Sequence, residues 1–109
     1  MTLRAVPKTK VDPHLPSPPA DLSVAGRELW RKLTTDYRVE DQAGQAVLAV
    51  ACRAADRAES CRAAVAKDGL VVRDRFRQTR PHPLLAVERS ARAQMLQALK
   101  QLSLPIPED

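Results

Sequence analysis

Residues 41–69, DQAGQAVLAVACRAADRAESCRAAVAKDG, are the longest helical signal in the chain and decide its fold. Asp41 is a residue type that caps helix N-termini, and Asp68-Gly69 is a pair that ends helices. We therefore expect one helix from about Asp41 to Lys67. Small apolar residues recur along it at steps of four and three, forming a seam at Val47, Ala51, Ala54, Ala58, Cys61 and Val65.

This helix is too long for a small domain to cover along its whole length. At about 1.5 Å per residue it spans near 40 Å. The seam therefore predicts either an intramolecular antiparallel helix pair or contacts with another copy of the chain, and we expect a homo-oligomer. The expected oligomer or helix-pair interface consists of Val47, Ala51, Ala54, Ala58, Val65, Leu84, Val87, Met95 and Leu102.

A second apolar stripe begins after Pro81-His82-Pro83, where Pro83 suits the first turn of a helix. It predicts a helix from about Leu84 to Leu102, which is the natural partner of the seam. The apolar face of this helix carries Leu84, Val87, Ala91, Met95, Ala98 and Leu102.

Between these two helices the apolar period changes to two. Leu70, Val72 and Phe76 alternate with Val71 and with arginines, which predicts a short strand or hairpin; a mobile basic loop has the same composition. The segment holds the densest positive cluster of the sequence and is a candidate contact for DNA phosphates. The cluster consists of Arg73, Arg75, Arg77 and Arg80.

A shorter helix is expected before residue 41, from Ser23, an N-cap residue type, to about Asp36. Its apolar face carries Ala25, Leu29, Trp30 and Leu33. Arg27, Arg31 and, if the helix extends so far, Arg38 line the opposite side. Such a stripe is either an ordinary solvated face or a contact to a phosphate backbone.

The first twenty residues contain five prolines and lack apolar periodicity, so we expect a flexible basic arm. The arm is either a plain linker or a DNA contact through Lys8 and Lys10. The predicted organisation is therefore an arm at 1–20, a helical domain at 21–105 and a short tail at 106–109. The fold class is mainly α, with a short first helix and a long antiparallel helix pair.

The charge balance points to a polyanionic partner. The chain has 18 Lys and Arg residues against 13 Asp and Glu residues, a formal net charge of +5. A single Trp, Tyr and Phe argue against the aromatic stacking platforms of single-strand binders, so duplex DNA is the better candidate. No apolar run suits a membrane span or a signal peptide, and we expect a cytoplasmic protein.

No constellation of catalytic or metal-binding residues is apparent. Cys52 and Cys61 lie nine positions apart on one helix and so face opposite sides, where they share neither a disulfide nor a metal. His14 and His82 have no partners at ligand spacing, and the glycines do not form a phosphate-binding loop. Acids such as Asp56 have basic neighbours, which is typical of a solvated face. We expect a binding protein that needs no cofactor.

The order of landmarks resembles the small subunits of phage terminases, in the compact class found in tailed phages. The resemblance covers about residues 16 to 107, with Ser103 where the family usually has Gly. It is carried by Pro18-Pro19-Ala20-Asp21-Leu22-Ser23, Leu29-Trp30-Arg31-Lys32-Leu33, Asp41, Cys52, Asp68-Gly69, Pro83-Leu84 and Leu102-Ser103-Leu104-Pro105.

The resemblance implies a protein that binds double-stranded DNA at the packaging site, forms a ring-like oligomer, and presents the DNA to a large ATPase and nuclease subunit. It would act in the cytoplasm of an infected or lysogenic bacterial host. Two other functions fit the residues alone. One is a small dimeric transcriptional regulator, and the other is a helical adaptor that binds only protein and whose charge aids solubility.

Overall fold

The computed structural model describes residues 6–7 and 15–102, and it is mainly helical as predicted. Helix α1 spans Val24–Asp36, α2 spans Gln42–Asp68 and α3 spans Leu84–Gln101. Strand β1 (Val6–Pro7) pairs antiparallel with β2 (Tyr37–Arg38), and β3 (Val71–Arg73) pairs antiparallel with β4 (Thr79–Pro81). Lys8, Lys10 and the predicted tail lie outside the described residues.

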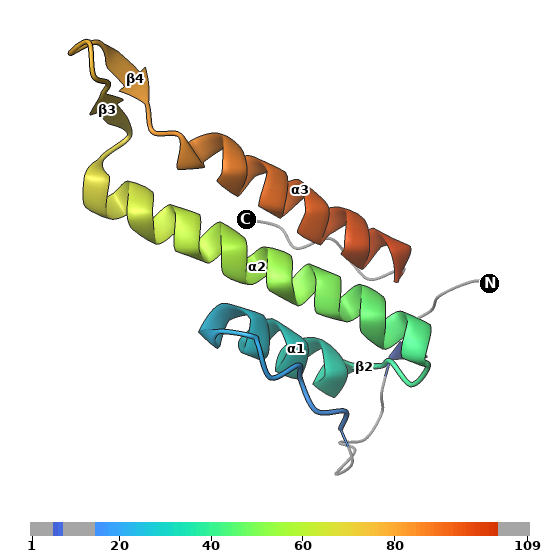
Figure 1. The fold of residues 1–109 in the computed structure, drawn as a ribbon. Coiled ribbons are helices and arrows are strands. Elements are labelled where there is room, and N and C mark those ends of the chain that lie inside the picture. Colours follow the sequence, from blue (N-terminus) through green and yellow to red (C-terminus); the bar gives the residue numbers. More distant parts are fainter. Residues whose placement is uncertain (1–5, 8–14, 103–109) are drawn as a thin grey trace.

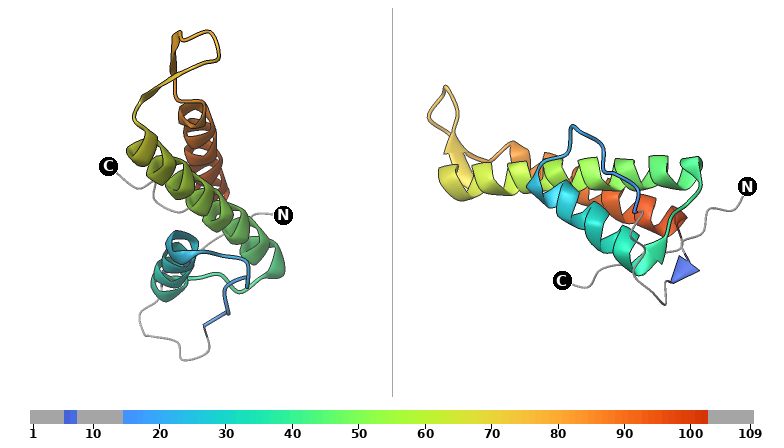
Figure 2. Two further views of the ribbon diagram at one scale, coloured as in Figure 1. Left: turned by 60° about the vertical axis from the view of Figure 1, so that its left-hand side comes forward. Right: turned by 90° about the horizontal axis from the view of Figure 1, so that it is seen from below.

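Helix α2 is the central element, with α1 on one side and α3 on the other (Figure 1). Both flanking helices run antiparallel to it, so the predicted long antiparallel pair is confirmed. The β3–β4 hairpin extends beyond the end of the α2–α3 pair, which two further views also show (Figure 2). The molecule is elongated, measuring 57 × 25 × 23 Å.

The seam of α2 is buried inside the chain itself. Five of its six members are buried, and Val47 packs half-buried against the same core. Alanine and cysteine side chains are short, so the neighbouring helices lie close to α2. Leu48 and Cys52, which the seam did not include, are also fully buried because α2 is covered on two sides.

Helix α3 buries a face that differs slightly from the prediction. Ala91, Ala98 and Leu102 are buried as expected, but Leu99 is buried too, and Val87 is 39% exposed. The cause is geometric, since the contact stripe drifts around a straight helix of 3.6 residues per turn. Leu84 and Met95 are half-buried.

Helix α1 is capped by a residue from α2. Ser23 precedes the helix as predicted, but its side chain makes no capping hydrogen bond. Instead the Asp56 carboxylate accepts hydrogen bonds from the backbone N–H groups of Ser23 and Gly26, each at 2.7 Å. A carboxylate there also faces the positive end of the helix dipole. Asp56 is therefore a fold-determining residue and not simply one of the solvated acids.

Gly26 allows this close approach of α1 to α2. A Cβ atom at this position would lie 2.6 Å from Asp56 Oδ2 and 2.8 Å from the backbone oxygen of Cys52. Cys52 itself is inert, because burial and the nearby Asp56 raise the pKa of its thiol to about 12. Both cysteines are free and buried.

His82 fixes the hairpin to the helix pair. Its imidazole is buried, with Nδ1 accepting a hydrogen bond from the backbone N–H of Leu84 at 3.1 Å. Nε2 therefore carries the proton and donates to the carboxylate of Asp68, at 3.0 Å. The backbone N–H of His82 donates to the oxygen of Leu70. The two ends of the hairpin are thus joined at its base.

Helix α1 ends at Asp36, as the sequence predicted, so Arg38 lies in β2 and does not continue the helical stripe. The predicted hairpin between α2 and α3 is confirmed by the antiparallel pairing of β3 with β4. The assignment of Phe76 to the apolar side of a strand was wrong, because the chain reverses in a turn after Arg73. Among the described residues, none of the helices combines the length and apolar character that a membrane crossing needs.

Candidate nucleic-acid interface

The turn of the hairpin is organised by Asp74. Its Oδ1 accepts hydrogen bonds from the backbone N–H groups of Phe76 and Gln78, at 2.8 and 3.0 Å. Its Oδ2 accepts one from Arg80 Nε at 3.1 Å. An aspartate that binds backbone groups two and four residues ahead is a common way to fix a tight turn. The tip, Arg75-Phe76-Arg77, is therefore held in a defined shape.

These hydrogen bonds make the stability of the turn depend on pH. The pKa of Asp74 lies below its ordinary value of 3.8, because the N–H of Gln78, the guanidinium of Arg80 and the N–H of Phe76 stabilise the carboxylate. A lowered pKa means that this stabilisation is complete above about pH 3.8 and is lost as pH falls through the lower, folded-state value.

We expect the amide proton signals of Phe76 and Gln78 to shift toward random-coil positions below pH 3.8, as Asp74 takes up a proton. Nuclear magnetic resonance spectra recorded across an acid titration measure this. In the control variant Asp74→Asn, the same amides should show no such acid transition. An unchanged position of both amides in the wild-type chain down to about pH 2 would contradict the role given to Asp74.

Three arginines of the predicted cluster extend from the hairpin without carboxylate partners. Arg73, Arg75 and Arg77 are exposed, and within the described part of the chain none of them forms an ion pair. Arg80 differs, since its guanidinium is bonded to Asp74 and Gln78. Several other arginines are also neutralised by nearby acids, in the pairs Arg53–Asp21, Arg62–Glu59 and Arg92–Glu88. The hairpin tip thus concentrates uncompensated positive charge.

The stripe on α1 is a second, separate basic region. Arg27 and Arg31 are exposed and line a groove of about 500 Å³ between α1 and residues 15–18. The groove wall is held by a hydrogen bond from Trp30 Nε1 to the backbone oxygen of Pro16, at 2.9 Å. Arg27 also donates to the backbone oxygen of Ala20 at 3.4 Å.

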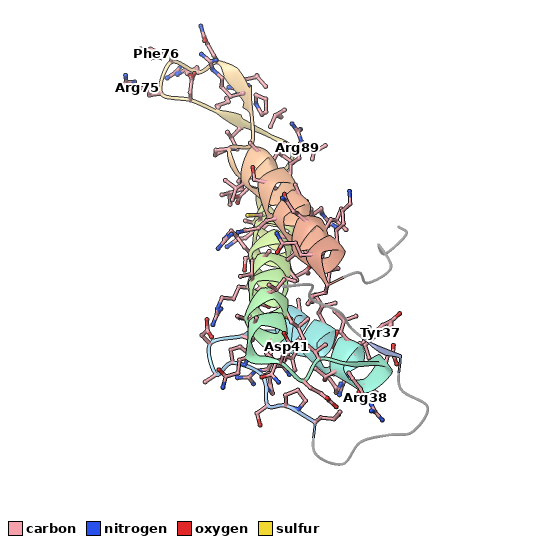
Figure 3. The ribbon with its side chains drawn as sticks, turned by 90° about the vertical axis from the view of Figure 1, so that its right-hand side faces the viewer. Tyr37, Arg38, Asp41, Arg75, Phe76 and Arg89 are labelled. Carbon is pink, nitrogen blue, oxygen red and sulfur yellow. The ribbon has the colours of Figure 1, made fainter. Side chains whose placement is uncertain are left out.

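Arg38 lies far from the tip of the hairpin (Figure 3). Arg75 and Phe76 lie at that tip, whereas Arg38 lies beside Tyr37 at the opposite end of the molecule. The structure brings Arg73, Arg75, Arg77 and Arg80 together and keeps Arg27, Arg31 and Arg38 away from them. The chain therefore offers two basic surfaces, and a ligand that contacts both must be long.

Two residues near the hairpin were missed by the sequence reasoning. Arg89, in the second turn of α3, is exposed at the hairpin end of the molecule (Figure 3). Phe76 was assigned to the apolar side of a strand, but it is 69% exposed in the turn. The sequence signal for Phe76 was its place between two arginines, which is unusual for a core aromatic.

The chemistry that these surfaces offer is charge and shape. Among the residues that the structure describes, no three His, Cys, Asp or Glu side chains gather as metal ligands would. Arginine side chains bind phosphate oxygens through several N–H donors at once, which suits a nucleic-acid backbone.

Comparison with known proteins agrees with the resemblance seen in the sequence. The family model described as "Phage terminase, small subunit" matches residues 26–107, which is most of the chain. Neither the curated proteins nor the solved structures include a match. The matched region contains α2, α3 and the hairpin between them, and nearly all of α1. The chain therefore belongs to the phage terminase small subunit family.

Proposed function

We propose that this chain is the DNA-recognition subunit of a phage genome-packaging terminase. It binds double-stranded DNA at the packaging site and presents it to the large subunit, which supplies the ATPase and nuclease activities. The chain itself is not an enzyme in this proposal. Membership of the family supports a packaging role and action inside the host cell.

The observation that carries the DNA-binding proposal is the hairpin, whose Arg73, Arg75 and Arg77 form no ion pair with any residue that the structure describes. Each guanidinium that neutralises a phosphate releases condensed counterions, which favours binding to duplex DNA. Asp74 and Arg80 hold the turn that presents these side chains. The arginines of α1, together with Lys8 and Lys10, supply further contacts.

Assembly into a homo-oligomer, which we propose is a ring, strengthens this binding. Several subunits that each bind DNA weakly reach a high avidity when they are linked, provided that their sites engage together. Val24, Val50 and Val87 are exposed and remain available for contacts between copies. The seam residues are already used within the chain, so an oligomer needs surfaces of this kind.

Two measurements on the purified full-length chain test the proposal. Gel shifts compare a duplex carrying the phage's packaging site with a scrambled duplex, and solution mass is measured with and without DNA. We expect preferential binding of the packaging-site duplex by an assembly larger than a dimer. A stable dimer that protects a palindromic operator would instead make the chain a transcriptional regulator. Equal or absent binding would contradict the recognition role.

A further inference from the structure

The only phenylalanine of the chain, Phe76, lies on the protruding hairpin (Figure 3). Phe76 lies at the tip of the β3–β4 hairpin with its side chain 69% exposed, and the Arg75 guanidinium lies 5.0 Å from the ring centroid. Large exposed aromatic side chains favour association with a partner, because burying them removes apolar area from water. The position of Phe76 therefore suggests that a partner buries it.

The tip is held rigidly and at a conformational cost. The backbone N–H of Phe76 is fixed by Asp74, and the N–H of Arg77 donates to the backbone oxygen of Asp74 at 3.0 Å. Arg77 has a φ of 62°, a left-handed conformation that glycine or asparagine adopts more readily. An arginine that occupies such a position keeps a second positive charge directly beside Phe76.

We propose that the hairpin enters the minor groove of duplex DNA, where Phe76 acts as an apolar wedge between two base pairs. Arg75 and Arg77 contact the phosphates on either side of the groove. This inference rests on the proposed function and adds to it a mode of recognition. In this mode, the affinity of the chain for DNA depends on how easily the duplex bends at the base-pair step where Phe76 inserts.

The surroundings of Phe76 favour DNA over a protein partner. Residues 70–81 contain four arginines and one aspartate, so the ring is delivered inside a strongly positive segment. The narrow minor groove has an enhanced negative potential that attracts arginine, and inserted apolar side chains kink DNA by partly unstacking a base step. Pyrimidine–purine steps unstack most easily, so they are the expected sites of insertion.

The test uses the full chain and a duplex of about 25 base pairs that has a central TA step and a fluorophore at each end. A second duplex carries 2-aminopurine at that step. When the wild-type chain binds, we expect the end-to-end distance to shorten and the 2-aminopurine fluorescence to rise. Phe76→Ala should abolish both signals and weaken binding about tenfold, with an unchanged salt dependence.

Two control variants isolate the wedge. Phe76→Leu retains an apolar side chain and should preserve both DNA signals. Leu70→Ala removes another exposed apolar residue, 66% exposed at the base of the hairpin, and should change neither.

The experiment distinguishes failure of the wedge from failure of the proposed function. If the wild-type chain binds duplex with a steep salt dependence but leaves both signals unchanged, or if Phe76→Ala distorts DNA as the wild type does, the wedge is wrong and the proposed function stands. The wedge is also wrong if Phe76→Ala changes only the solution mass, since Phe76 would then contact another copy. If the wild-type chain fails to bind duplex even at low salt, the proposed function fails as well.

Discussion

Replacing Arg73, Arg75 and Arg77 together by alanine is expected to weaken binding to packaging-site DNA about 500-fold at about 0.1 M salt. The reason is counterion release, which gives each phosphate contact close to a factor of ten in affinity at that salt concentration. Fluorescence anisotropy titrations of the two proteins measure the difference. Among the described residues, Arg73, Arg75 and Arg77 have no carboxylate partners, so little stability should be lost with them.

A second triple variant controls for total charge. Arg53, Arg62 and Arg92 are also exposed, but each is paired with a carboxylate. Replacing these three by alanine removes the same three positive charges and should weaken DNA binding far less. Equal losses in the two variants would mean that only net charge matters, and would exclude the hairpin as the specific contact.

Gly26→Ala should destabilise the packing of α1 against α2. Alanine favours a helix over glycine by about 1 kcal/mol, yet the new Cβ would collide with Asp56 and with the backbone of Cys52. We expect a net loss of about 1 to 3 kcal/mol in the free energy of unfolding, because the backbone cannot move aside cheaply. For a domain of this size that lowers Tm by at least about 4 °C.

Gly44→Ala is the matched substitution in α2. Its Cβ would lie 2.7 Å from Asp41 Oδ1, a side-chain atom that can rotate away. The variant should therefore lose little more than the Asp41 cap, about 1 kcal/mol, partly offset by helix propensity. Adding Asp56→Ala to Gly26→Ala relieves only one of the two clashes, so the double variant should remain destabilised. Urea unfolding distinguishes these cases, and a Gly26→Ala chain as stable as the wild type would refute the close helix crossing.

The helices were predictable because local signals and apolar spacing agree. Asp41 caps α2 by accepting a hydrogen bond from the backbone N–H of Gly44, and Gly69 follows its last residue with a positive φ, as the sequence indicated. The antiparallel pair was one of the two predicted arrangements, because the second apolar stripe, at Leu84 to Leu102, matched the seam. The spacing of apolar residues did not decide whether the seam is covered by another copy or by the chain itself. In the structure, α3 and α1 cover it.

The details that position the candidate site depend on contacts between distant residues. Asp56 caps a helix thirty residues away, which no local pattern encodes. The turn at Asp74 was hidden because the alternation of Val72, Arg73 and Asp74 resembles a strand that continues. Phe76 is exposed because the chain turns after Arg73, and Arg38 lies away from the hairpin because α1 ends at Asp36. The spacing of apolar residues does not locate either of these points.

The most direct test of a DNA-recognition subunit is the salt dependence of its binding to duplex DNA. Titrations of the wild-type chain with packaging-site duplex between about 50 and 200 mM salt give the slope of log affinity against log salt. We predict a straight line whose steepness falls by about 2.7 in the Arg73, Arg75 and Arg77 triple variant, about 0.9 for each lost phosphate contact. No measurable binding by the wild-type chain at about 50 mM salt would contradict the account.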